Sequence, residues 1–459
     1  MTNSQILVLL TYAILMVFIG ILPGRIRGKE AFLISSRQLH GASSGFTIAA
    51  SKIGGGLLVT YSTLVFTYGL AAFWLFIGYI IGYIIFYRFA KKLHRESKIS
   101  QYYTMADYFQ EHYGKSAGIV IGILCTISMG GWIITNLIAG GLLLSNISGW
   151  SHIFTTSALS ITIAAYLLVG GFNSVVRTDI IQYISLILIA TLIGVFFFNA
   201  PDIVAESSLL SVEKMPIGKI IVFLLVGTIF PMGSAELWQR VYATDKESDF
   251  KKAITIASIS FIAIGGILSY VCFKLMGTNI IDSDISTELA LAVGVSKILA
   301  NTHPMLSTLW FIAFAAAILS SADTFIYTTA SSAVQDILQR LGIVGEDQTV
   351  YWIRIAIFIL AILGVLGAVL FKNVVAVTFY FLGVSLVLGV VALSSWGSKT
   401  TISTKSLVSA TIVGFCVSTL HALLKGIDMN TTILAFISTL MFLVFSEISL
   451  RVYRFFQSR

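Results

Sequence analysis

The stretch "ASKIGGG" (50–56) lies in the middle of an apolar segment, 44–68, that is long enough to cross a membrane. Three consecutive glycines weaken a helix, and backbone carbonyls freed beside them need a partner from protein, water or a cation. A lysine placed inside such a segment is also costly. The combination indicates that this stretch serves a binding site as well as packing.

The composition around this stretch is that of a membrane protein. The chain has 459 residues, of which 57% are hydrophobic and only 11% are charged, whereas globular domains are about 25% charged. No single aqueous core buries that much apolar surface, so we predict an all-α protein that crosses the membrane many times. Thirteen apolar segments are expected, at 4–23, 44–68, 70–92, 117–145, 153–170, 177–199, 217–238, 252–277, 305–334, 350–371, 374–395, 405–424 and 431–453.

The basic residues predict the orientation of these segments. Alternate connections on one side hold 22 of the 29 lysines and arginines, the other side holds five, and Lys52 and Lys274 lie inside segments. Because basic loops stay in the cytoplasm, we expect the N-terminus outside and the C-terminus inside, in the inner (cytoplasmic) membrane. The net charge of +8 is thereby explained without a nucleic-acid partner.

A second interrupted segment follows five segments after the first. Pro231 and Gly233 interrupt 217–238, and proline removes a helical hydrogen bond. Since five is an odd number, the two groups of five would enter the membrane in opposite senses, which is the pattern of a transporter with an inverted repeat. Glycine and proline are also common in membrane helices without any such role. We divide the chain into an extra helix and loop (1–43), a first repeat (44–199), a second repeat (217–395) and two further helices with a short tail (405–459).

One segment of the second repeat carries hydroxyl groups on a single helical face. Its members are Ala317, Ser320, Ser321, Thr324 and Thr328. Small hydroxyl faces often serve only to hold helices together. However, Asp323 lies beside this face, and a carboxylate within the membrane is by default a functional candidate. Hydroxyls, carbonyls and one carboxylate form the oxygen-only shell that a hard cation such as sodium needs.

Asp179 is a further candidate carboxylate near the inner end of its segment. It is either a cation ligand or the partner of Arg177 or of the adjacent turn.

Four stretches resemble the sodium/solute symporter family, which includes bacterial proline, pantothenate, sialic-acid and sugar symporters. They are "KEAFLISSRQLHG" (29–41), "GGFNSVVRTDIIQ" (170–182), "ELWQRVYATDKESDFKKA" (236–253) and "AAAILSSADTFIYTTASS" (315–332). The resemblance implies a LeuT-like core of five plus five helices that works by alternating access.

The resemblance also implies ion and substrate sites. A first sodium site would use the carbonyls of Ala50, Ile53 and Ala317 and the hydroxyls of Ser320 and Ser321. A candidate second sodium site falls on Asp179, Ser320, Asp323 and Thr324. The predicted substrate cavity is lined by Lys52, Gly54, Leu57, Phe76, Tyr79 and Phe230. In the family, the position of Lys52 faces this cavity and usually carries a small or polar side chain.

Three interpretations of Lys52 are open. It is a counter-ion for an anionic substrate, a fixed cation that weakens sodium coupling, or the structural partner of an intramembrane carboxylate such as Asp323. Apolar Phe76, with Trp74 and Tyr79 near it, argues against a sugar, because hydroxyl-rich ligands need polar partners. A small carboxylate or amino acid fits better.

The sequence therefore predicts a sodium-coupled symporter for a small organic solute that bears a carboxylate or is otherwise anionic. The alternatives are a symporter for a neutral or zwitterionic solute in which Lys52 is structural, and a non-transporting sensor with the same fold. We find no motif of an enzyme. Sodium, the solute and the lipid bilayer are the expected partners, and the expected state is a monomer.

Overall fold

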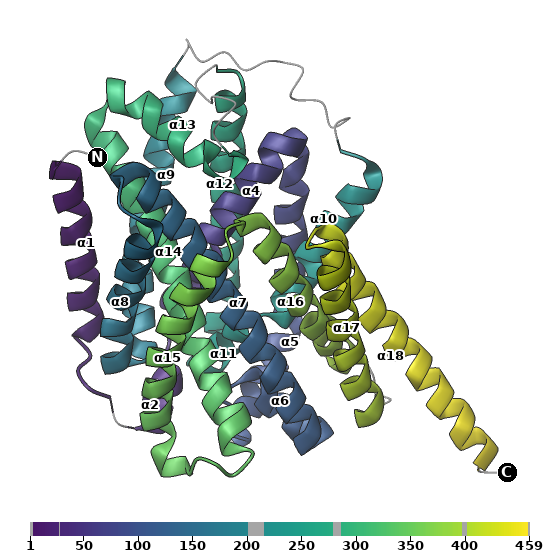
Figure 1. Cartoon of the computed structure of the whole chain (residues 1–459). Helices are drawn as coiled ribbons and strands as arrows, with labels where there is room; N and C mark the ends of the chain where they lie inside the picture. The colour runs from purple at the N-terminus through teal and green to yellow at the C-terminus, as the bar shows by residue number, and fades with distance from the viewer. Residues whose placement is uncertain (1–2, 27, 201–214, 279–285, 397–401, 458–459) are drawn as a thin grey trace.

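A computed structural model describes residues 3–26, 28–200, 215–278, 286–396 and 402–457 (Figure 1). Within these ranges the regular secondary structure is helical, apart from one isolated β-bridge between Leu39 and Thr244. Helices are the expected result for long apolar segments, because a helix satisfies all of its backbone hydrogen bonds internally in lipid. The prediction of an all-α membrane protein is confirmed.

The helices follow the predicted segments in order. The first half of the chain contains α1 (Asn3–Ile21), α2 (Lys29–Ile34), α3 (Gly41–Lys52), α4 (Gly55–Tyr68), α5 (Trp74–Ile99), α6 (Met105–Tyr113), α7 (Lys115–Ser148), α8 (His152–Gly170) and α9 (Phe172–Asn199). The second half contains α10 (Ile217–Ile229), α11 (Ala235–Ala243), α12 (Glu247–Met276), α13 (Thr287–Thr302), α14 (Pro304–Ser331), α15 (Thr349–Leu370), α16 (Val374–Trp396), α17 (Thr404–Lys425) and α18 (Met429–Gln457). Each of the thirteen predicted segments contains a helix, and two of them contain a broken pair.

By length and composition, ten helices in the described ranges can cross a membrane, or eleven when one bent pair is counted as a span. This number is lower than thirteen for two reasons. Gly55–Ile99 counts as one span because only a 3₁₀ turn, Gly69–Phe73, separates α4 from α5. Gln5–Ile21 falls among the shorter apolar helices. The connection between α12 and α14 contains a further helix, α13.

The first break is narrower than the three glycines suggest. Helix α3 ends at Lys52, Ile53 and Gly54 are non-helical, and α4 begins at Gly55. Gly55 and Gly56 are instead sites of close packing, because an added Cβ would lie 2.6 Å from a side-chain atom of Ile318 and of Thr135, respectively. Only Gly54 among the glycines is part of the break itself.

The second break lies between α10 and α11. Phe230–Gly233 form a short 3₁₀ helix, Ser234 is extended, and the chain bends by 49° at this point. Gly233 permits close contact with α16, because an added Cβ would lie 1.9 Å from the carbonyl oxygen of Ser385. The predicted interruption at Pro231 and Gly233 is therefore present.

Helix packing follows the pattern of a five-plus-five repeat. Helix α3 packs on α12 as α10 packs on α5, and α9 packs on α14 as α16 packs on α7. In each comparison, a helix of the first group contacts a helix of the second group, and the helices at the same positions with the groups interchanged contact each other as well. This pattern supports the proposed division into 44–199 and 217–395. Helices α17 and α18 pack on each other, and the C-terminal end of α18 extends away from the helical body (Figure 1).

Candidate transport site

An ion pair joins the two helix breaks. Lys52, the last residue of α3, pairs through Nζ with Oε1 of Glu236 in the first turn of α11. The side chains are only 4% and 1% exposed. Lys52 Nζ also donates to Ser234 Oγ at 2.6 Å and lies 4.3 Å from the centre of the Phe230 ring. The carboxylate that pairs with Lys52 is thus Glu236, and the suggestion of Asp323 was wrong.

Glu236 is a candidate site residue that the sequence analysis missed. Its stretch entered only as part of the family resemblance, although Glu236 lies three residues after Gly233. A carboxylate beside a helix break inside an apolar segment is the same signal that identified Lys52. That signal was available in the sequence for both members of the pair.

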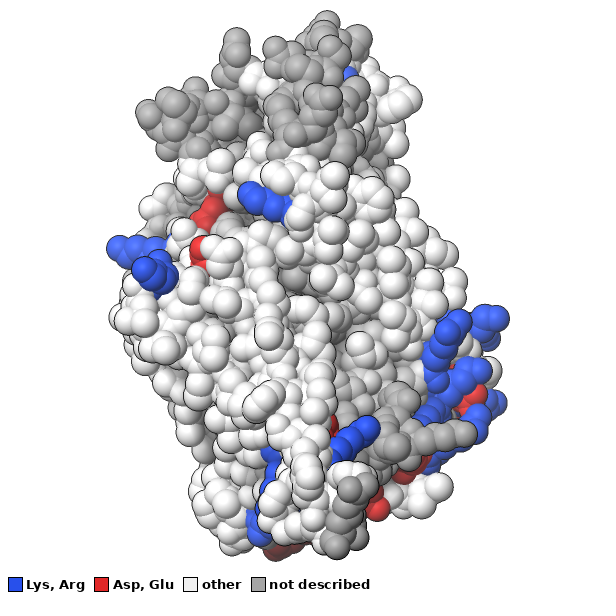
Figure 2. Space-filling model, turned by 90° about the vertical axis from the view of Figure 1, so that its right-hand side faces the viewer, with Lys and Arg blue, Asp and Glu red and all other residues white. Residues whose placement is uncertain are grey.

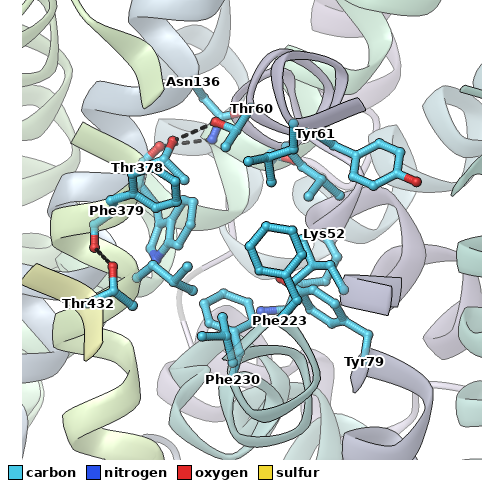
Figure 3. A pocket seen from close by; sticks show the side chains of 18 of the residues that line it. Lys52, Thr60, Tyr61, Tyr79, Asn136, Phe223, Phe230, Thr378, Phe379 and Thr432 are labelled. Atoms are coloured by element: carbon cyan, nitrogen blue, oxygen red, sulfur yellow. Dashed lines mark hydrogen bonds between the residues drawn. The ribbon is translucent and has the colours of Figure 1, made fainter. Parts of the chain in front are cut away.

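A cavity lies over this ion pair (Figure 3). Lys52, Gly54, Leu57, Tyr79 and Phe230 line it, so five of the six predicted substrate residues come together.

Phe76 is the exception among the predicted cavity residues. Its side chain is fully buried behind the cavity wall, with its ring centre 4.5 Å from that of Tyr61 and 5.7 Å from that of Phe261. The reason is that Phe76 lies on the face of α5 that packs against α4 and α12. The placement of Phe76 in the cavity was therefore wrong.

Helices that are distant in sequence complete the cavity wall. Their lining side chains include Trp132 and Asn136 from α7, Thr378 and Phe379 from α16, and Met429 and Thr432 from α18. Most of the polar groups among them already have partners, such as Thr60 with Thr378 at 3.1 Å and Thr432 with the Phe379 carbonyl at 2.6 Å (Figure 3). The wall is therefore mainly aromatic and apolar. No local sequence pattern indicates these positions, because they meet only through packing.

The residues of the predicted first sodium site meet where the end of α3 contacts α14. Ser320 Oγ donates to the carbonyls of Ala50 and Ala317, both at 3.1 Å. Ser321 Oγ donates to the carbonyls of Ala50 at 3.3 Å and Ser51 at 3.0 Å. Ile53 is fully buried in the non-helical turn that follows α3. This group of carbonyl and hydroxyl oxygens has the donor chemistry that suits sodium.

The residues of the candidate second sodium site are arranged around an arginine. Nη2 of Arg240, on α11, donates to Asp179 Oδ2 at 3.3 Å and to Thr324 Oγ1 at 2.8 Å. Asp179 thus pairs with Arg240, and not with Arg177 as one interpretation had it. Asp323 accepts hydrogen bonds from Tyr166 at 2.7 Å and from Thr178 at 3.2 Å. A cation placed between Asp179 and Thr324 would lie beside the guanidinium and be repelled by it.

The charges around these sites are not balanced. Lys52 pairs with Glu236 and Arg240 pairs with Asp179, while Asp323 accepts hydrogen bonds from uncharged side chains. All five charged side chains are buried. When all five are ionised, one negative charge is left over. A buried charge is costly unless a cation compensates it, so the excess favours a bound cation close to α14.

Residues 32–210 match the model of the Sodium:solute symporter family. The high-affinity proline transporter PutP of Bacillus subtilis is 22% identical over 73% of this chain and 74% of its own length. The human high affinity choline transporter 1 is 24% identical over 75% of this chain and 63% of its own length. The chain is related to the sodium:solute symporter family.

Solved structures agree with this relationship at the level of the fold. A Na⁺-coupled sialic acid symporter in a substrate-bound outward-open state matches with a TM-score of 0.79 and 16% identity, over 96% of this chain and 97% of that one. The nucleobase-cation-symport-1 transporter Mhp1 matches with a TM-score of 0.57 and 11% identity, over 92% and 93% of the two chains. The chain therefore has the LeuT-like fold of these multi-pass membrane transporters. The family resemblance found in the sequence is confirmed.

Replacing Gly54 with alanine is expected to weaken sodium binding at least about ten-fold. The added Cβ would lie 2.2 Å from Ser321 Oγ and 2.6 Å from Asn136 Oδ1, so the predicted ligand Ser321 would be displaced. Sodium titration of the thermal stability of the purified protein measures this effect. Gly266→Ala is the matched control, because nothing lies within 4 Å of its added Cβ. Equal sodium affinities of the two variants would argue against an ion site at Ser321.

Proposed function

We propose that the chain is a sodium-coupled symporter that imports a small, partly apolar solute bearing a carboxylate. The observation that carries this proposal is the position of Lys52, which lines the aromatic cavity and is the last residue of α3, the helix whose end supplies the Ala50 carbonyl to the proposed sodium site. One relative, the high-affinity proline transporter of Bacillus subtilis, takes an amino acid as its solute, which supports the proposal.

Lys52 retains the capacity to bind a solute. An ammonium group has three donors, of which one is directed to Glu236 and one to Ser234. The third donor is left for an acceptor in the cavity, and a carboxylate is the acceptor that gains most from a charged donor. Loss of Lys52 should therefore weaken binding of solutes with a carboxylate more than binding of solutes without one.

The pairing with Glu236 refines the class of solute. Lys52 and Glu236 together carry no net charge, so an anionic solute would add an uncompensated negative charge to an apolar cavity. A zwitterion adds none, and its ammonium group is stabilised by aromatic faces such as those of Trp132 and Phe230. We therefore favour a small amino acid over a simple carboxylate anion.

Coupling follows from the element that the two ligands share. Sodium at Ala50, Ala317, Ser320 and Ser321 would order the end of α3, and Lys52, the last residue of that helix, lines the solute cavity. Each ligand then favours the same arrangement of the break, and the coupling free energy is reciprocal. One sodium ion carried inward with a zwitterion moves one net positive charge, which gains about 2.3 kcal/mol per 100 mV.

The same proposal includes the orientation in the membrane. Lysine and arginine side chains gather toward the lower end of the molecule in Figure 2, with fewer toward the upper end. This distribution supports an N-terminus outside and a C-terminus in the cytoplasm of the inner membrane.

The test of this function is ligand-dependent thermal stability followed by uptake into proteoliposomes. L-Proline, other small amino acids, simple carboxylates and choline are compared in sodium and in potassium. We expect an amino acid to stabilise the protein in sodium only, to be accumulated down a sodium gradient, and to lose at least about ten-fold in affinity in Lys52→Ala. Stabilisation without accumulation would favour a sensor, and choline as the ligand would contradict the carboxylate.

A further inference from the structure

We propose that Glu236 sets the charge class of the transported solute, and that it does so by neutralising Lys52 from behind the cavity wall. This inference rests on the proposed function, because it concerns the solute site of the symporter. Glu236 does not line the cavity, whereas Lys52 does. A solute in the cavity can therefore contact Lys52 directly, whereas Glu236 acts on the solute only through the net charge of the site.

The surroundings of Glu236 indicate that it neutralises the charge of Lys52 and contributes little to packing. Apart from the contact of Oε1 with Lys52, the carboxylate oxygens of Glu236 have no hydrogen-bond partner among the described residues. Other buried carboxylates of the chain are held by several groups. Asp179, for example, accepts from Thr47 and Arg240. A buried carboxylate with so few contacts contributes its charge and little else.

Arg240 does not take over the neutralisation of Glu236, although it lies one turn further along α11. Its guanidinium donates to Thr47, Asp179 and Thr324, and its contact with Glu236 is to the backbone carbonyl, at 3.1 Å. The Glu236 carboxylate thus forms its ion pair with Lys52. The solute site therefore contains one matched pair, with no spare positive charge for an anion.

Changing one member of the pair should change the preferred solute. Glu236→Gln keeps the size of the side chain and leaves the charge of Lys52 without a counter-charge. The affinity of the site for anionic solutes should therefore rise relative to its affinity for zwitterions. Lys52→Met leaves the negative charge of Glu236 beneath an aromatic cavity, so the affinity for cationic solutes should rise relative to that for zwitterions. In Lys52→Met/Glu236→Gln both charges are absent, so the preference for zwitterions should remain, with weaker binding because the carboxylate donor is lost.

Three solutes of equal ring size separate these outcomes. L-Proline is a zwitterion, cyclopentanecarboxylate is the anion without the amine, and pyrrolidine is the cation without the carboxylate. Affinities are measured by thermal stabilisation of the full-length purified protein in saturating sodium. We expect the ratio of affinity for the anion to affinity for the zwitterion to rise at least ten-fold in Glu236→Gln. The sodium titration should remain that of the native chain.

Two controls keep the test falsifiable. Glu236→Asp retains the charge and should retain the native preference, even if a shorter side chain lowers stability. Glu247→Gln removes a carboxylate that pairs with Lys91 and Arg95, on the cytoplasmic side in the proposed topology, and should leave the ratio unchanged. An unchanged ratio in Glu236→Gln, or a native chain that already prefers the anion, would overturn the inference while leaving a carboxylate symporter in place. Failure of the native chain to bind any of the small amino acids and carboxylates, proline and cyclopentanecarboxylate included, would overturn both proposals.

Discussion

Replacing Arg240 with methionine is expected to lower the free energy of unfolding by about 3–5 kcal/mol, the usual cost of leaving one charge of a buried pair without its partner. Arg240 is 1% exposed and pairs with Asp179, which is completely buried. The same change removes hydrogen bonds to Thr47 and Thr324. The effect is measured as the loss of thermal and denaturant stability of the purified protein in detergent.

A double variant distinguishes lost charge balance from lost packing. Asp179→Asn in the Arg240→Met background removes the carboxylate that has lost its ion-pair partner, and it should recover more than half of the lost free energy of unfolding. Arg95→Met is the control, because Arg95 is an exposed partner of Glu247 and such pairs contribute only about 0–1 kcal/mol. No recovery in the double variant would mean that the shape of Arg240, and not its charge, stabilises this region.

Replacing Ser320 and Ser321 together with alanine is expected to reduce sodium affinity by about 100-fold or more. Both hydroxyls converge with the Ala50 carbonyl where α3 meets α14. Polar contacts to a charged group are worth about 1.5–3 kcal/mol each, and a loss of about 2.7 kcal/mol already corresponds to 100-fold. Sodium titrations of thermal stability and of solute uptake both measure the change.

The control for this variant is Ser331→Ala on the same helix. Ser331 is also buried, but its hydroxyl donates to the Tyr327 carbonyl within α14 and not to the Ala50 carbonyl of α3. It should leave the sodium titration unchanged. If the double variant instead kept native sodium affinity, the ion would have to bind elsewhere, and the carboxylates Asp179 and Asp323 would be the next candidates.

The sequence alone determined the features that depend on local pattern. Apolar segments of membrane length predicted the helices, because a chain in lipid must satisfy its backbone hydrogen bonds within each segment. The hydroxyls of Ser320 and Ser321 recur at helical spacing, and Gly54 and Pro231 mark breaks that local backbone preferences explain. The all-α membrane fold could be predicted from these signals, whereas the family was indicated by the resemblance of the four stretches at 29–41, 170–182, 236–253 and 315–332.

Only the tertiary structure decided which charges pair and which side chains face the cavity. Lys52 meets Glu236 across 184 positions of sequence, and Asp179 meets Arg240 across 61. Phe76 turns away from the cavity, while Met429 and Thr432 of α18 approach it from outside the repeat. Such contacts depend on how helices rotate and cross. Periodicity along one helix identifies its faces, but the packing of all helices together determines what each face meets.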